Sequence, residues 1–83
     1  MQHFLSNPGQ LGHLLLSARR RLGLTQADAA ARVGISQSRL STLESDPSAI
    51  SLAQMLALTA LYGLRIAVDD QPMAQEPSSK SVW

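Results

Sequence analysis

Polar side chains that can hydrogen-bond to nucleic-acid bases gather between residues 36 and 45, in the stretch SQSRLSTLES. If this stretch is a helix, turning by about 100° per residue, Leu40 and Leu43 mark its inner side and the hydroxyl and amide side chains face outward. Such side chains offer donors and acceptors without bulk, which suits contact with base edges in the major groove of DNA. The segment predicts these DNA-contacting residues: Ser36, Gln37, Ser38, Arg39, Ser41 and Thr42.

Among these predicted residues, Gln37 and Ser38 are expected to contact bases, because they lie at the start of the helix. Arg39 could contact either a guanine or a phosphate. Gln26, at the start of the preceding helix, is expected to meet a phosphate together with the free backbone amides there. The alternative interpretation of these polar residues is a solvated helix face without a ligand.

Four helices are expected to position these residues, because each has a start and a stop signal. Capping residues precede them at Asn7, Thr25, Ser36 and Ser51, and breakers follow at Gly23, Gly34, Asp46 with Pro47, and Gly63. Leucines spaced by three to four residues give the first helix one apolar face, whereas the fourth helix is apolar on several sides and must be covered on more than one.

The second and third helices carry the spacing that lets one short helix lie across another. Ala30 is small enough for close approach, Gly34 is free to adopt a positive φ, and Leu40 is an apolar anchor. The remaining inward positions are also apolar: Ala29, Val33, Ile35 and Leu43. This arrangement presents the third helix to a DNA groove.

Length and composition restrict the possible classes of protein. The 83 residues suffice for one small domain, and the absence of cysteine excludes disulfides and thiolate metal sites. His3 and His13 have no carboxylates arranged about them, so we expect no enzyme activity, no metal and no cofactor. Without a span of roughly 18 apolar residues or a signal peptide, the expected location is the cytoplasm.

The net charge of +1 conceals an uneven distribution. Residues 1 to 45 carry five arginines against two carboxylates, and residues 66 to 83 carry one lysine against three carboxylates. Phosphate binding depends on the local field and not on the total, so the basic half favours nucleic acid.

After Gly63 the apolar residues Leu64, Ile66 and Val68 alternate with other residues, a period typical of a β-strand. One strand leaves its backbone unpaired, so we predict that residues 64–69 pair antiparallel with the same strand of a second copy. The alternative is an extended segment packed on its own helices.

The predicted division of the chain is an N-terminal segment at 1–7, a helical domain at 8–63, the strand at 64–69 and a tail at 70–83. The tail is rich in serine and proline, so we expect it to lack fixed structure in isolation. Trp83 is the sole tryptophan, and tryptophan is a favoured interface anchor, so a role in partner binding or in controlled degradation is expected.

The motif GLTQADAAARVGISQSRLSTLESDP resembles the XRE-type, lambda-repressor-like helix-turn-helix family. With the later GLRIAVDD and the terminal tryptophan, residues 10 to 69 resemble its HipB-type antitoxins. The resemblance implies an all-α fold of four to five helices with one C-terminal strand pairing across a homodimer. It also implies an ion pair between Arg19 and Glu44, and it supports Gln26, Gln37, Ser38 and Thr42 as DNA-facing residues. One departure is the SQSR opening of the third helix, where a basic residue and glutamine are more usual.

The function implied by the resemblance is that of a bacterial, nucleoid-associated antitoxin. Such a dimer binds palindromic operator DNA, represses its own operon and inhibits a HipA-type serine/threonine kinase toxin. Two alternatives remain: a stand-alone repressor of a phage or restriction-modification operon, and an interaction adaptor that has lost DNA binding. Salt-dependent DNA affinity separates the adaptor from the others, and a kinase partner separates the antitoxin from the repressor.

Overall fold

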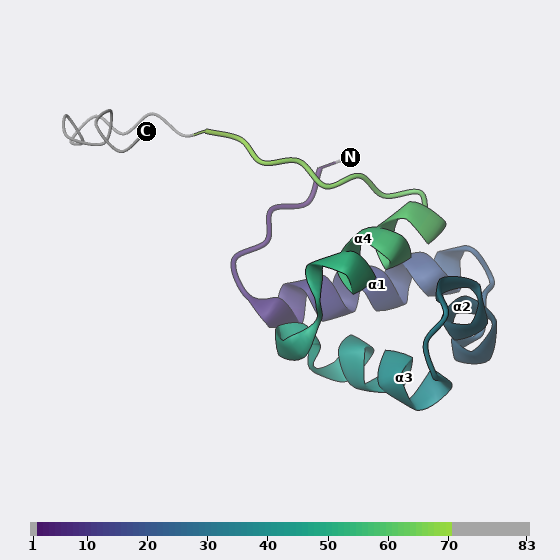
Figure 1. Cartoon of the computed structure of the whole chain (residues 1–83). Helices are drawn as coiled ribbons and strands as arrows, with labels where there is room; N and C mark the ends of the chain where they lie inside the picture. The colour runs from purple at the N-terminus through teal and green to yellow at the C-terminus, as the bar shows by residue number, and fades with distance from the viewer. Residues whose placement is uncertain (1, 71–83) are drawn as a thin grey trace.

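Four α-helices and one 3-10 turn form the body of the computed structural model, which describes residues 2–70 (Figure 1). In chain order they are α1 (Pro8–Arg21), α2 (Gln26–Val33), α3 (Gln37–Ser45), the 3-10 turn η1 (Pro47–Ala49) and α4 (Leu52–Leu61). The four predicted helices are confirmed, whereas residues 64–69, predicted as a β-strand, form none in this single chain, in which no β-strand occurs between residues 2 and 70. Within the same range, no helix is both long and apolar enough to cross a membrane.

Each helix begins at the polar cap that the sequence predicts. Asn7, Thr25, Ser36 and Ser51 each accept a hydrogen bond from the backbone amide three residues ahead. Two of these ends are reciprocal capping boxes, Thr25 with Asp28 and Ser51 with Gln54. The caps satisfy amides that a helix leaves free at its start, which fixes the boundaries of these short helices.

The turn between α2 and α3 depends on Gly34, whose φ is +77°. In this left-handed conformation a side chain would be strained, and glycine is not. The amide of Ile35 then donates to the carbonyl of Ala30, which closes the end of α2. The chain therefore reverses within three residues and lays α3 across α2.

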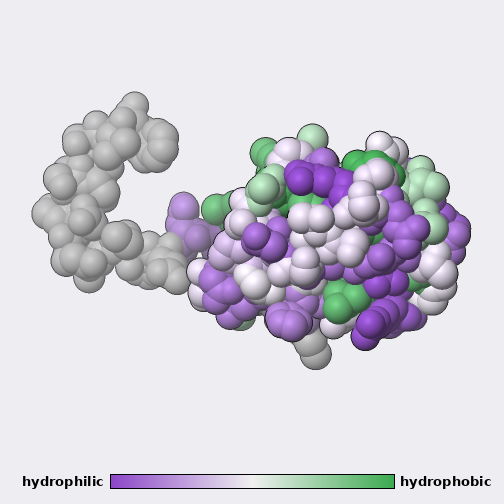
Figure 2. Space-filling view, turned by 90° about the horizontal axis from the view of Figure 1, so that it is seen from below, coloured by the Kyte–Doolittle hydropathy of each residue, from purple (hydrophilic) through white to green (hydrophobic). Residues whose placement is uncertain are grey.

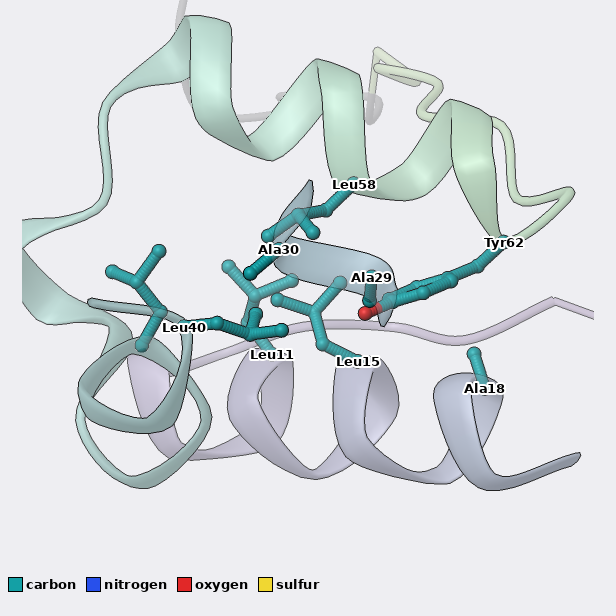
Figure 3. Packing of buried hydrophobic residues seen from close by; sticks show 9 residues of the cluster. Leu11, Leu15, Ala18, Ala29, Ala30, Leu40, Leu58 and Tyr62 are labelled. Atoms are coloured by element: carbon teal, nitrogen blue, oxygen red, sulfur yellow. The ribbon is translucent and has the colours of Figure 1, made fainter. Parts of the chain in front are cut away.

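The core forms where the apolar faces of the four helices meet (Figure 3). Leu15 of α1, Leu40 and Leu43 of α3, and Leu58 of α4 are completely buried. Small residues complete the cluster: Ala30 lies near Leu58, and Ala18 and Ala29 lie on the side of Tyr62, where little side-chain volume separates the helices. The inner face of α3 is thus fixed by packing, which determines the direction of its outer face.

Gly12 marks a close approach between α1 and the end of α3. A Cβ at this position would lie 2.7 Å from the backbone oxygen of Glu44. That distance is below van der Waals contact with an atom that cannot move independently, so only glycine fits without a shift of the backbone.

The described residues leave the outer face of α4 and the segment that follows it uncovered. Leu52 is 64% exposed and Leu56 48%, and beyond the helix Ile66 is 44% exposed and Val68 91%. The extended segment turns back from the end of α4 in Figure 1. The requirement that α4 be covered on more than one side is therefore not met by this chain's own described residues.

Candidate nucleic-acid interface

The outer face of α3 is a polar surface. Gln37, Ser38, Ser41 and Thr42 are all exposed, while Leu40 and Leu43 of the same helix are buried. Figure 2, which views the molecule from the α3 side of Figure 1, shows mainly hydrophilic and neutral residues. The structure thus brings the predicted residues together on one face.

The residues of this face differ in how free their polar atoms are. Ser36 accepts the amide of Arg39, and the Thr42 hydroxyl donates to the carbonyl of Ser38. By contrast, neither Gln37 nor Ser41 has a side-chain hydrogen bond to any residue that the structure describes. Gln37 and Ser41 therefore present uncommitted donors and acceptors.

An ion pair joins α1 to the end of α3, as the family resemblance implies. Arg19 Nε lies 2.6 Å from Glu44 Oε2, and Nη2 lies 3.1 Å from Oε1. Their side chains are 10% and 5% exposed, and Arg19 Nη1 also donates to the carbonyl of Leu24. The hydrogen bond to Glu44 raises the pKa of Arg19 above its ordinary value, and burial opposes that rise. This bidentate pair positions α3 on α1.

Gln26 contributes to the same cluster. Its amide nitrogen donates to Glu44 Oε1 at 2.9 Å, so its side chain is fixed beside the ion pair. The first backbone amides of α2 lie at this residue. A shallow hollow of about 250 Å³ opens here, and its lining includes Arg20, Gln26 and Ser41. An exposed arginine, an amide side chain and a hydroxyl thus converge where three helices meet.

Arg39 differs from the other predicted DNA-contacting residues because its side chain bonds to residues outside α3. Its Nη2 donates to the carbonyl of Ala49 at 3.1 Å and to Gln54 Oε1 at 3.2 Å. The guanidinium is therefore directed towards η1 and α4, a contact that the sequence did not predict. The SxxQ capping box at Ser51 was the available signal, since it places the Gln54 oxygen at the start of α4.

The remaining predicted residues fall into two groups. Leu64 is half-buried against the core, and its amide donates to the carbonyl of Thr59, so it closes the end of α4. Ile66 and Val68 are exposed. Trp83 lies outside the described residues, and within those residues no cluster of candidate metal ligands occurs.

A family model described as helix-turn-helix matches residues 15–68, and the chain belongs to this family. Its fold is of the XRE, HipB-like type. A HipB variant in complex with an O2 20mer has a TM-score of 0.76 and 25% identity to this chain, covering 87% of it and 100% of that HipB chain. A structure titled as a HipA-HipB-O2-O3 complex has a TM-score of 0.76 and 24% identity, and the match covers 86% of this chain and 100% of that one. A HipB-O4 20mer complex has a TM-score of 0.75 and 24% identity, and the match again covers 86% of this chain and 100% of that one. No curated protein sequence matches the chain.

Proposed function

We propose that this chain is the antitoxin of a type II toxin-antitoxin module that binds palindromic operator DNA as a dimer and represses its own operon. The observation that carries the proposal is the exposed polar face of α3. The buried Arg19–Glu44 ion pair fixes one end of this helix, and the left-handed Gly34 turn precedes the other. This arrangement inserts the start of α3 into the major groove. Similarity to HipB structures titled as complexes with 20mers supports the same mode of binding.

Within this mode, Gln37, Ser38 and Ser41 contact base edges, and Ser36 and Thr42 lie beside them at the groove. The hollow lined by Arg20 and Gln26 holds a phosphate, because exposed guanidinium and amide groups meet there near the helix start. Gln26 is thus both a partner of Glu44 and a phosphate contact through its backbone amide.

DNA binding is tested with duplexes selected by the chain from a random-sequence library and measured by fluorescence anisotropy. The wild-type chain should prefer the selected palindrome over a scrambled duplex, and Gln37→Ala should reduce that preference about 5- to 100-fold. Equal affinity for both duplexes would contradict operator recognition, whereas loss of affinity without loss of preference would contradict the role of Gln37.

The proposed dimer forms by pairing of residues 64–69 across a two-fold axis, and the exposed side chains of Leu52 and Leu56 offer further apolar surface to the second copy. Exposed apolar residues on both α4 and the following segment support a second copy as the cover. Analytical ultracentrifugation should give twice the chain mass of 8.9 kDa. Deleting residues 64–69 should give a monomer, and an unchanged mass would contradict strand pairing.

A HipA-type serine/threonine kinase is the proposed second partner, supported by the similarity to a HipA-HipB-O2-O3 complex. Mixing the chain with the kinase encoded beside its gene should give one complex in size-exclusion chromatography and reduce autophosphorylation. Operator binding with neither effect would instead support a stand-alone repressor. Removal of Val82 and Trp83 tests the tail: unchanged inhibition and half-life would contradict a role for Trp83.

A further inference from the structure

Arg39 differs from the neighbouring arginines in how its side chain is committed. Arg20, Arg21 and Arg32 are exposed, and none has a side-chain hydrogen bond within residues 2–70. Arg39 is half-buried, and one of its nitrogens donates to both the Ala49 carbonyl and Gln54 Oε1. These bonds use both hydrogens of Nη2 and direct the guanidinium towards η1 and α4, while Nε and Nη1 have no hydrogen bond within residues 2–70.

Gln54 Oε1 accepts two hydrogen bonds at the start of α4. The amide of Ser51 donates to it at 3.2 Å, and Arg39 Nη2 donates at the same distance. Ala49 ends η1, so the guanidinium joins the first turn of α3 to both the connecting turn and the first turn of α4. The backbone of α3 packs mainly on α1, α2 and η1, and that of α4 mainly on α2. Arg39 therefore supplies a direct side-chain link between α3 and α4.

We propose that Arg39 is a positioning residue for operator binding, and that it acts through Ala49 and Gln54 instead of contacting a base or a phosphate. Its position in the first turn of α3 is important, because this end of the helix carries Gln37 and Ser38. The link fixes how far that turn stands out from the body of the molecule. Small misplacement of a contacting group weakens all of its interactions together, which produces a uniform loss of affinity.

The inference rests on the proposed DNA-binding function and distinguishes three roles for one side chain. A base contact would give Arg39→Ala an altered preference at one base pair. A phosphate contact would lower the slope of log affinity against log salt by about 0.9. A positioning role changes neither quantity, and it requires that uncharged Gln54 also contribute to binding.

The test is a double-mutant cycle on the full chain with the selected duplex, measured by anisotropy over a salt series. Arg39→Ala and Gln54→Ala should each weaken binding by about 5- to 30-fold. The double variant should be no weaker than Arg39→Ala alone, with the salt slope and base preference unchanged. Gln54→Glu, which keeps an acceptor for Arg39, should retain wild-type affinity.

Ser51→Ala is the matched control, because it removes the other half of the α4 capping box and leaves the Arg39 to Gln54 bond in place. It should lower thermal stability without weakening DNA binding. Binding weakened as much by Ser51→Ala as by Gln54→Ala would overturn the inference and assign the effect to the cap.

Three other results would also overturn it: a neutral Gln54→Ala, a smaller salt slope in Arg39→Ala, or an altered base preference. If the wild-type chain shows no sequence preference at all, the proposed function fails and the inference fails with it. The first three results contradict the inference alone.

Discussion

Two regions of this small domain differ in how far the described residues satisfy their polar groups and cover their apolar side chains. Around α1, α2 and the end of α3, polar atoms find partners within the chain: Arg19, Gln26 and Glu44 form one bonded cluster. Around α4 and residues 64–70, apolar side chains such as Leu52 and Val68 remain exposed. Among residues 2–70, the first region pairs its buried polar groups, whereas the second leaves apolar side chains uncovered.

On the proposed function, this difference separates two requirements of operator binding. The first region would hold α3 rigidly, because base contacts depend on the position of short side chains. The second would contact another copy of the chain, since two half-sites need two recognition helices about one DNA turn apart. We therefore expect mutations in the first region to change folding stability, and mutations in the second to change assembly.

The largest effect is expected from Glu44→Ala. The change leaves Arg19 buried without its anion, and breaking such a pair lowers the free energy of unfolding by about 3 kcal/mol or more. The melting temperature should then fall by roughly 10 °C or more. Asp28→Ala is not a suitable control because it breaks a cap, so exposed Arg32→Ala serves instead. An unaltered melting temperature for Glu44→Ala would show that the pair does not stabilise the first region.

Gly12→Ala should give the next largest effect. The added methyl group would lie 2.7 Å from the Glu44 carbonyl oxygen, and overpacking of this kind costs about 1–3 kcal/mol. Gly9→Ala is the control in the same helix, since an added methyl group there would meet a single atom, the Asn7 side-chain oxygen, at the longer distance of 3.2 Å. Urea denaturation of both variants measures the difference. Equal midpoints would indicate that α1 and α3 are not in close contact.

A smaller effect of opposite sign is expected from Tyr62→Phe. Tyr62 is 2% exposed, and its hydroxyl has no hydrogen-bond partner within the described residues (Figure 3). Removing an unpaired buried hydroxyl should raise the free energy of unfolding by about 1 kcal/mol. Thermal denaturation at pH 7 measures this gain, and a loss of stability would indicate an internal partner for the hydroxyl.

The same residue predicts a pH dependence. Burial, followed by the nearby charge of Glu44, raises the pKa of Tyr62 above 10.0, its ordinary value. Because the unfolded chain loses this proton more easily, stability should be complete below pH 10 and fall as pH rises above it. Tyr62→Phe should reduce this alkaline decline, and an identical decline in both proteins would assign it to other groups.

The smallest effect on monomer stability is expected from Leu56→Ser, since Leu56 is already half exposed in the single chain. Substitutions at exposed positions usually change the free energy of unfolding by less than about 0.5 kcal/mol. The same variant should raise the dimer dissociation constant in sedimentation equilibrium. A large loss of stability in dilute monomer would instead mean that Leu56 belongs to the core.

The helices were predictable from sequence because their signals are local. Caps at Asn7, Thr25, Ser36 and Ser51 and the breaker at Gly34 each act within a few residues, and the structure places every one as predicted. The outer face of α3 followed from the burial of Leu40 and Leu43, which is a property of one helix.

The contacts that depend on tertiary structure were harder to predict. The bond from Arg39 to Gln54 joins residues on two helices, and no spacing rule relates them. Likewise, Leu64 fits the alternating strand pattern, yet in the single chain it packs on the core at the end of α4. Pairing of Ile66 and Val68 depends on a second chain. The strand therefore stays a prediction from the alternating pattern of the sequence.

The central claim, that two copies of this chain bind one palindromic operator through α3, is tested most directly by sedimentation velocity of the chain with its selected duplex. The claim predicts a single complex that contains two chains per palindrome, and a weaker complex of two chains per duplex when half of the palindrome is scrambled. One chain on the intact palindrome, or the same complex on a fully scrambled duplex, would contradict it.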